Sequence, residues 1–270
     1  MNNLQYLSKR IKYDLLKLLY IVGSGHPGSC LSIIDILIIL YYNILNLSDN
    51  KLISDKFLLS KGHASPALYI VMLYKNILKK EDIQYFRTIK SKIQSGTHIN
   101  MGFDNISGSL GQNLSVACGY ALNAKLKNLS YKTYVLLGDG EMQEGQIWEA
   151  MAFAKKHKLN NLIGIIDNNY LQSTDTVANI LETKLELIDK ILAFGWNVYN
   201  VNGHDLSALH NVFNNKIVND KPTMIIADTI KGKGISFMEN KVEWHNQKIT
   251  KEHFEKICIE LSINDEVSLL

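Results

Sequence analysis

The sequence is poor in proline and cysteine, with three of each among its 270 residues. Cys30, Cys118 and Cys258 lie far apart and form no CxxC pair. This spacing argues against a structural zinc site or a disulfide framework and favours a reducing, cytoplasmic compartment. The sequence also has no low-complexity linker and no internal repeat. We therefore expect residues 1–270 to form a single domain.

A dense basic run is lacking as well. The formal net charge is +3 and the lysines are spread along the chain, which indicates a solvated surface rather than a nucleic-acid-binding one. The amphipathic N-terminus has neither the apolar core nor the small-residue cleavage site of a signal peptide. The most apolar run, residues 31–45, contains Asp35 and is shorter than the roughly twenty residues of a membrane span. We expect a buried core helix here, and neither a membrane nor a nucleic-acid partner.

The regular features are helices and strands that alternate along the chain. Apolar positions at helical spacing predict helices over 3–21, 30–45, 64–78, 112–127, 145–157, 183–193, 205–217 and 250–260. Short apolar runs predict strands over 55–60, 133–138, 162–167, 196–201 and 223–229. Ser29 is expected to cap the helix after it, and Pro66 to begin its own helix. Residues 88–111 are expected to be irregular.

This alternation predicts the fold class. Strands separated by helices pair in parallel through right-handed crossovers. The strands read as nearly continuous apolar runs, such as YVLLG and LIGIID, as a sheet buried on both faces requires. The expected fold is α/β, a doubly wound and mostly parallel sheet with helices on both faces. Ligands of such sheets bind beyond the carboxyl ends of the strands.

Polar turns follow two of the predicted strands, GDG at 138–140 and DNN at 167–169. Asp139 offers a carboxylate, Asn169 an amide oxygen, and the turn after it the backbone carbonyl of Leu171. These are hard oxygen ligands of the kind Mg²⁺ prefers, often together with phosphate. Either turn alone is also explained as an ordinary strand ending. Together, with a strand before each and one helix between them, they favour a metal–diphosphate site.

Two further features of this edge suit a diphosphate. Gly138 and Gly140 carry no side chain, which lets a phosphate approach the backbone. The helix predicted to begin near Gly145 points the positive end of its dipole at the same edge.

Several segments together resemble one family. GDGEMQEGQIWEA and the later IDNN are similar to the thiamin-diphosphate motif, in which GDG precedes a distant asparagine. The segments SGHPGS, LSKGHASPALY, GSLGQNLSVACG and TIKGKGISFMENKVEWH occur in the order typical of transketolases. The resemblance runs from about residue 5 to residue 260. Transketolases are usually much longer, so the chain resembles the N-terminal, diphosphate-binding subunit of a split transketolase.

The resemblance implies roles for individual residues. The implied metal ligands, for Mg²⁺ or for Ca²⁺ or Mn²⁺ in its place, are Asp139, Asn169 and Leu171. The implied contacts of thiamin diphosphate are His63, Gly108, Ser109, Leu110, Gly140, Glu144, Asn169 and His245. Within this set Leu110 would be an apolar wedge under the cofactor. Glu144 would lie at a subunit contact that links two active sites, although an acid in the first turn of a helix is also favoured by the dipole.

Three histidines are implied to be catalytic, namely His26, His98 and His245. Imidazole donates from one nitrogen, accepts at the other and titrates near neutrality, which suits proton transfer to a developing alkoxide. The remaining histidines, His157, His204, His210 and His253, are interpreted as surface or hydrogen-bonded core residues. The sequence departs from the long-chain pattern at GTHIN around His98, at Ser109 and Asn113, and at Asn246.

The implied activity is transfer of a two-carbon ketol unit from a ketose phosphate to an aldose phosphate in the pentose phosphate pathway. The glutamate that activates the cofactor would belong to a separate C-terminal subunit, in an α2β2 assembly. One alternative is another split thiamin-diphosphate enzyme, such as the α chain of a 2-oxoacid dehydrogenase, which is not expected to carry SGHPG or the final WH. A second is a 1-deoxyxylulose 5-phosphate synthase, normally one long chain. A third is a non-catalytic remnant that binds the cofactor.

Overall fold

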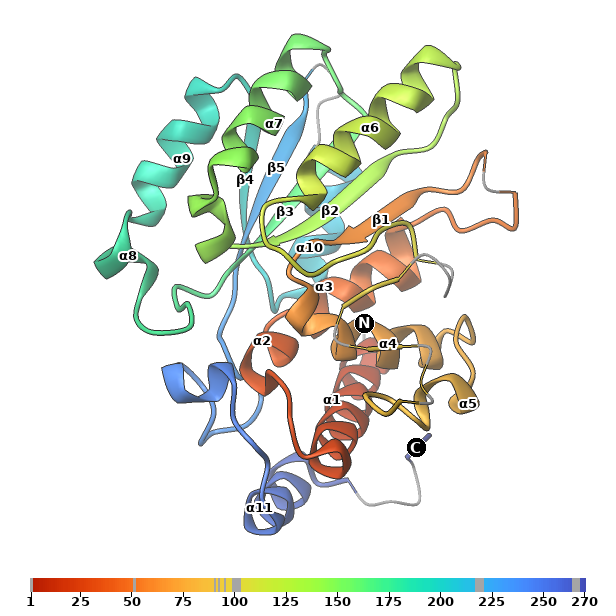
Figure 1. The fold of residues 1–270 in the computed structure, drawn as a ribbon, viewed down its shortest axis with the longest axis vertical. Helices are drawn as coiled ribbons and strands as arrows, with labels where there is room; N and C mark the ends of the chain where they lie inside the picture. Colours follow the sequence, from red (N-terminus) through yellow and green to blue (C-terminus); the bar gives the residue numbers. More distant parts are fainter. Residues whose placement is uncertain are drawn as a thin grey trace.

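The computed structural model describes residues 2–50, 52–89, 91, 93–94, 96–98, 103–216, 221–263 and 268–270. In this part of the chain five parallel strands form one sheet in the order β1-β2-β3-β5-β4 (Figure 1). The strands are β1 Lys56–Leu59, β2 Thr133–Gly138, β3 Leu162–Asn168, β4 Asn197–Asn202 and β5 Thr223–Asp228. Every residue of β1, β2 and β3 is buried. The prediction of a parallel α/β sheet is confirmed, and its edge strand β4 is only partly buried.

Helices cover both faces of the sheet (Figure 1). One face packs against α6 Asn113–Leu126, α7 Gly145–Lys156 and α9 Lys184–Ala193. The other packs against α1 Asn2–Val22, α3 Ile34–Ile39, α4 Ser65–Tyr74 and α10 Leu206–Asn211. Successive strand residues point to opposite faces, so Ile165 joins one hydrophobic core and Ile166 the other. The sheet is thus the middle layer of three.

Shorter elements complete the described fold. The remaining helices are α2 Pro27–Leu31, α5 Lys80–Ile83, α8 Val177–Ile180 and α11 Lys251–Leu261. Single 3₁₀ turns occupy Gly62–Ala64, Gly140–Gln143 and Val242–His245, and π-type turns occupy Leu40–Ile44 and Val212–Lys216. The helix α11 packs on α1, where the rings of Phe254 and Tyr20 stack 4.8 Å apart.

The helix predicted over 30–45 is wrong in its boundaries. It begins earlier, at Pro27, whose fixed φ suits the first turn, and Ser29 lies inside it rather than capping it. It breaks after Leu31, where the Ser32 hydroxyl donates to the Asp167 carboxylate in β3 at 2.7 Å and lies 3.1 Å from the carbonyl of Ser29. The bond to Asp167 ties Ser32 to the sheet at the point where helical hydrogen bonding stops. Pro66 does stand in the first turn of α4, as predicted.

One window among the described residues, 27–44, is long and apolar enough to cross a membrane. Within the fold, 83% of this window is buried. The segment packs among α1, α4 and α10 in the hydrophobic core on one face of the sheet, as the predicted core helix would. Burial of this kind is typical of the core helix of a globular domain.

Candidate active site

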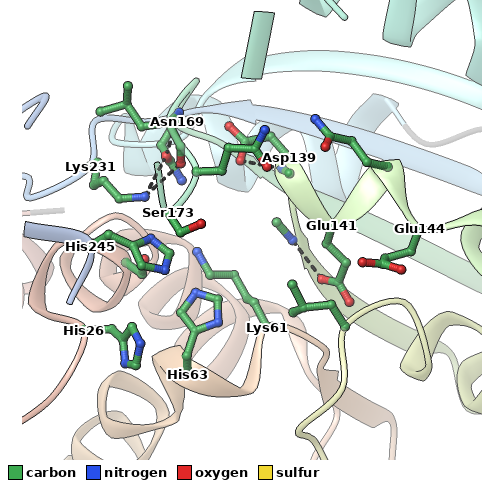
Figure 2. A pocket seen from close by; sticks show the side chains of 17 residues that line it. His26, Lys61, His63, Asp139, Glu141, Glu144, Asn169, Ser173, Lys231 and His245 are labelled. Atoms are coloured by element: carbon green, nitrogen blue, oxygen red, sulfur yellow. Dashed lines mark hydrogen bonds between the residues drawn. The ribbon is translucent and has the colours of Figure 1, made fainter. Parts of the chain in front are cut away.

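The carboxyl ends of the parallel strands lie at one edge of the sheet, and a polar side chain follows each of four strands. Lys61 comes after β1, Asp139 after β2, Asn169 after β3 and Lys231 after β5. All four line a cavity of about 260 Å³, together with His26, His63 and His245 (Figure 2). The structure thus brings together residues from widely separated parts of the sequence.

The two turns predicted to meet are in direct contact. The backbone N–H of Tyr170 donates to Oδ2 of Asp139 at 2.6 Å, and the N–H of Gly140 donates to Oδ1 at 2.8 Å. The N–H of Asp139 in turn donates to the carbonyl of Asp167 at 3.3 Å. Burial, followed by the neighbouring Asp167 carboxylate, raises the pKa of Asp139 to about 6. A divalent cation beside Asp139 would offset both effects.

The oxygens of the second turn already converge on a cationic group. The ammonium of Lys231 donates to the carbonyl of Leu171 at 2.8 Å and lies 3.4 Å from Oδ1 of Asn169. Burial and the neighbouring Lys61 ammonium lower the pKa of Lys231 to about 8. A carboxylate, an amide oxygen and a backbone carbonyl at this place fit a hard divalent cation.

Among the described residues, no group of three or more His, Cys, Asp or Glu side chains forms a metal site by itself. A metal held by the predicted ligands would therefore depend on amide and carbonyl oxygens and on oxygens of its ligand. Mg²⁺ often binds in this manner, with one or two carboxylates and shared phosphates.

The carboxylate of Asp167, a residue of β3, accepts hydrogen bonds from side chains of several elements beneath the cavity. It is fully buried and directly bonded to the Lys61 ammonium and the Thr229 hydroxyl. Ser32 Oγ at 2.7 Å and Asn169 Nδ2 at 3.0 Å also donate to it. Burial alone would raise the pKa of Asp167, but Lys61 and the hydroxyl donors hold it below its usual value. Asp167 thereby fixes Lys61 and Asn169 relative to each other.

Three histidines form one wall of the cavity (Figure 2). The ring centroids of His26, His63 and His245 lie between 5.1 and 5.4 Å apart. Burial and then nearby cations lower the pKa of His26 to about 4 and of His245 to about 3. Burial, then Lys61, also lowers the pKa of His63. All three rings are neutral at pH 7 and able both to donate and to accept.

Close backbone packing holds His26 beside His245. The helix α2, which follows His26, lies against the turn Val242–His245, and a Cβ on Gly28 would stand 2.8 Å from the carbonyl of Trp244. Only glycine permits this approach.

Several polar atoms in the cavity wall have no hydrogen-bond partner among the described residues. These atoms are His26 Nδ1, Ser29 Oγ, Gln143 Nε2, Gln172 Nε2 and His245 Nδ1. Buried polar groups are rarely left unpaired, so each is a candidate contact for a ligand. With two lysines beside them, they fit an anionic, oxygen-rich ligand such as a diphosphate.

The sequence matches the family described as transketolase, thiamine diphosphate binding domain, over residues 11–268. The chain belongs to this family. It is 37% identical over 260 residues to transketolase-like protein 2 of Bos taurus, covering 94% of this chain and 41% of that protein. The chain thus spans about two fifths of the length of such relatives.

A shorter relative matches end to end. This relative is one of the subunits of apulose-4-phosphate transketolase from Phocaeicola vulgatus, and it is 35% identical over 264 residues, covering 96% of this chain and 94% of the relative. Transketolase from Campylobacter jejuni has a similar structure, with a TM-score of 0.86 and 30% identity over 97% of this chain and 42% of that one. The chain therefore resembles both a separately encoded transketolase subunit and one domain of the longer enzymes.

Most of the catalytic, cofactor-binding and metal-binding residues implied by the transketolase resemblance line the cavity. They are His26, His63, Leu110, Asp139, Gly140, Glu144, Asn169, Leu171 and His245. Glu144 is exposed at the N-cap of α7, and its side chain makes no capping bond. Gly140 faces the cavity, although a Cβ there would stand 2.8 Å from Oε1 of Gln172, so packing also explains this glycine. The functional roles of these residues remain predictions.

Three implied residues do not line the cavity. Gly108 and Ser109 are exposed and directly precede Leu110, which does line it. His98 is exposed too, and residues 95 and 99–102 around it lie outside the described part of the chain. The predicted roles of all three remain predictions.

Sequence reasoning missed four charged residues of the site. These are Lys61, Glu141, Asp167 and Lys231. Glu141 is buried, contacts the Ser60 hydroxyl, and accepts from Gly111 N at 2.8 Å and Gly138 N at 3.1 Å, which fixes the Leu110 loop. The signal was available for the lysines, because each follows a predicted strand at the edge where ligands bind.

Proposed function

We propose that this chain is the N-terminal subunit of a transketolase that depends on thiamin diphosphate and magnesium. The reaction transfers a two-carbon ketol unit from a ketose phosphate to an aldose phosphate, as in the pentose phosphate pathway, in the cytoplasm. The observation that carries the proposal is the contact between the Asp139 and Asn169 turns beside Lys231 and the three histidines.

Each part of the cavity has its own task in this proposal. Asp139, Asn169 and the Leu171 carbonyl would hold Mg²⁺, and Lys231 with His63 would face the diphosphate. Bound thiamin diphosphate would supply the carbon nucleophile for ketol transfer. His26 and His245 would hold the substrate hydroxyl and carbonyl oxygens. Because both rings are neutral at pH 7, each can donate one hydrogen bond to these oxygens and accept another.

The other half of the active site is proposed to come from a partner chain. The long relatives carry nearly three fifths of their length beyond the part that matches this chain. The Phocaeicola relative is named as one subunit of its enzyme, which implies that a second one exists. We propose that this partner carries the glutamate that activates the cofactor, in an α2β2 assembly. Neither chain alone would then transfer ketol units.

The test is a two-protein assay. The chain and a candidate partner that resembles the C-terminal part of transketolase are mixed with thiamin diphosphate, Mg²⁺, xylulose 5-phosphate and ribose 5-phosphate. We expect sedoheptulose 7-phosphate from the mixture and none from either protein alone. Turnover by the chain alone would contradict the need for a partner. Cofactor binding without turnover, across a panel of ketose and aldose phosphates, would instead identify a non-catalytic remnant.

A further inference from the structure

His204 connects helix α3 to the segment that follows β5. It lies in the turn between β4 and α10, at the same edge of the sheet as the cavity. Its Nδ1 is 2.8 Å from Oδ2 of Asp35, and its Nε2 is 2.8 Å from the backbone nitrogen of Ile230. Ile230 directly precedes Lys231, the lysine that contacts the Asn169 turn.

The two contacts fix the tautomer of the ring. A backbone N–H can only donate, so Nε2 of His204 must carry the lone pair that accepts from Ile230. The proton of the neutral ring is therefore on Nδ1 and is donated to Asp35. Asp35 is itself held in place, because Ser8 Oγ donates to its Oδ1 at 2.7 Å and Lys12 Nζ lies 3.8 Å from its Oδ2.

The N–H of Ile230 needs such an acceptor. The sheet ladder ends just before it, with Thr229 N donating to the carbonyl of Asn168 at 3.1 Å. The turn that carries His204 then packs closely on this segment, since Gly203 N donates to the Asp228 carbonyl at 2.7 Å. A Cβ on Gly203 would stand 2.5 Å from Cγ2 of Thr229. Glycine at 203 therefore allows the turn to approach Thr229 closely enough for His204 to reach Ile230.

Lys231 is anchored on both sides as a result. His204 holds the residue before it, and Gly232 N, after it, donates to the carbonyl of Gly28 at 3.0 Å. We propose that His204 is a positioning residue for the active site. Oriented by Asp35, it accepts from Ile230 and so fixes the place of Lys231 relative to Asn169 and Leu171. This role rests on the proposed function, in which Lys231 faces the cofactor diphosphate.

Two substitutions separate this role from a general contribution to stability. In His204→Gln the amide oxygen can reach the place of Nε2 and still accept from Ile230. In His204→Asn the shorter amide reaches only the place of Nδ1, where it donates to Asp35 and leaves Ile230 without its acceptor. Both changes remove the ring and keep a neutral polar side chain, so they serve as matched controls for each other.

Two measurements are made on the wild-type chain and both variants, each mixed with the partner chain where it is available. The first is the dissociation constant of thiamin diphosphate with Mg²⁺, and the second is hydrogen exchange of the Ile230 amide. We expect His204→Gln to stay near wild type in both. We expect His204→Asn to bind the cofactor at least about 10-fold more weakly, because losing a residue that orients the groups of a metal site typically costs this much. We also expect faster hydrogen exchange of the Ile230 amide in this variant.

Equal cofactor affinity or equal exchange in the two variants would overturn the positioning role while leaving the proposed function intact. If the wild-type chain bound no thiamin diphosphate, the proposed function would fail, and with it the role of His204 toward the cofactor. The exchange measurement would then still decide whether His204 holds Ile230.

Discussion

Asp139 is the residue on which the proposed metal site depends most. It is 5% exposed and accepts one backbone N–H at each carboxylate oxygen, so its position is set before any ligand binds. The Asp139→Asn variant keeps the shape of the side chain and removes its charge. We expect Mg²⁺-dependent binding of thiamin diphosphate to weaken by more than about 100-fold. Losing a residue that only supports a metal ligand already costs up to that much, and Asp139 is proposed to be a ligand itself.

Titration calorimetry at fixed Mg²⁺ measures this effect. Asp189→Asn is a suitable control, because Asp189 is exposed on α9 and does not line the cavity. Wild-type affinity in Asp139→Asn would remove this residue from the metal site.

The buried histidines predict how stability depends on pH. The pKa of His26 is near 4 in the folded protein and about 6.5 in an unfolded chain. Between pH 6.5 and pH 4, His26 is therefore protonated in the unfolded state but remains neutral in the folded state. The free energy of unfolding consequently falls as the pH drops from 6.5 towards 4. Each such group contributes at most about 1.4 kcal/mol per pH unit, and partial exposure reduces this.

Urea unfolding at pH 7 and pH 5 tests the effect. The stability difference between the two pH values should be smaller in His26→Gln than in wild type. The exposed His157→Gln serves as control. Parallel pH dependences in wild type and His26→Gln would show that His26 is protonated as easily in the folded protein as outside it.

Among single residues, the proposed metal ligands could be predicted from the sequence, whereas the charged residues that pair with one another around the site could not. Asp139 and Asn169 could be predicted because each ends an apolar run with a polar side chain. The bond between Lys61 and Asp167 joins residues that are remote in the sequence, and only the strand order β1-β2-β3 brings them together. His204 was interpreted as an ordinary histidine, since its partners Asp35 and Ile230 lie on other elements.

Among the elements, helix α2 and the turn Val242–His245 depend on each other. In Gly28→Ala the new methyl group would meet the Trp244 carbonyl, 2.8 Å away, and Cγ of Lys231, 2.9 Å away. Overpacking of this kind costs about 1–3 kcal/mol. We expect lower stability and weaker cofactor binding together, because His26, Lys231 and His245 all move.

The comparison is Gly119→Ala in α6, where a Cβ meets no atom within 4 Å. There a helical alanine should raise stability by about 0.5–1 kcal/mol. Unfolding curves and cofactor titrations of both variants decide the matter. Unimpaired binding in Gly28→Ala would mean that α2 and the turn can separate without damage to the site.

The boundaries of helices and strands could be predicted where they depend only on residues close together in the sequence. The strands and the helices α1, α6, α7, α9 and α11 lie close to their predicted ranges, because apolar periodicity and polar turns mark their ends. The break after Leu31 did not follow, since it depends on the contact between Ser32 and Asp167 across the core. The short helices α5 and α8 have too few residues to show a period.

For the whole molecule, the proposal makes cofactor binding and association with the partner chain a single coupled equilibrium. If the partner holds the aminopyrimidine end while this chain holds the diphosphate, each must tighten the binding of the other by the same factor. We expect saturating thiamin diphosphate with Mg²⁺ to lower the dissociation constant of the two chains by at least about 5-fold, the low end of typical couplings. Analytical ultracentrifugation with and without cofactor measures this, and an association indifferent to the cofactor would contradict a shared site.

The central claim is that the Asp139 and Asn169 turns jointly bind a divalent ion under a diphosphate. The most direct test is a crystal structure of the chain, with its partner if needed, grown with thiamin diphosphate and Mn²⁺ in place of Mg²⁺ and measured at the manganese absorption edge. The account predicts one anomalous peak bonded to the Asp139 carboxylate, the Asn169 amide oxygen and the Leu171 carbonyl, with the diphosphate beside Lys231. Manganese or cofactor bound elsewhere, with these oxygens uncoordinated, would contradict it.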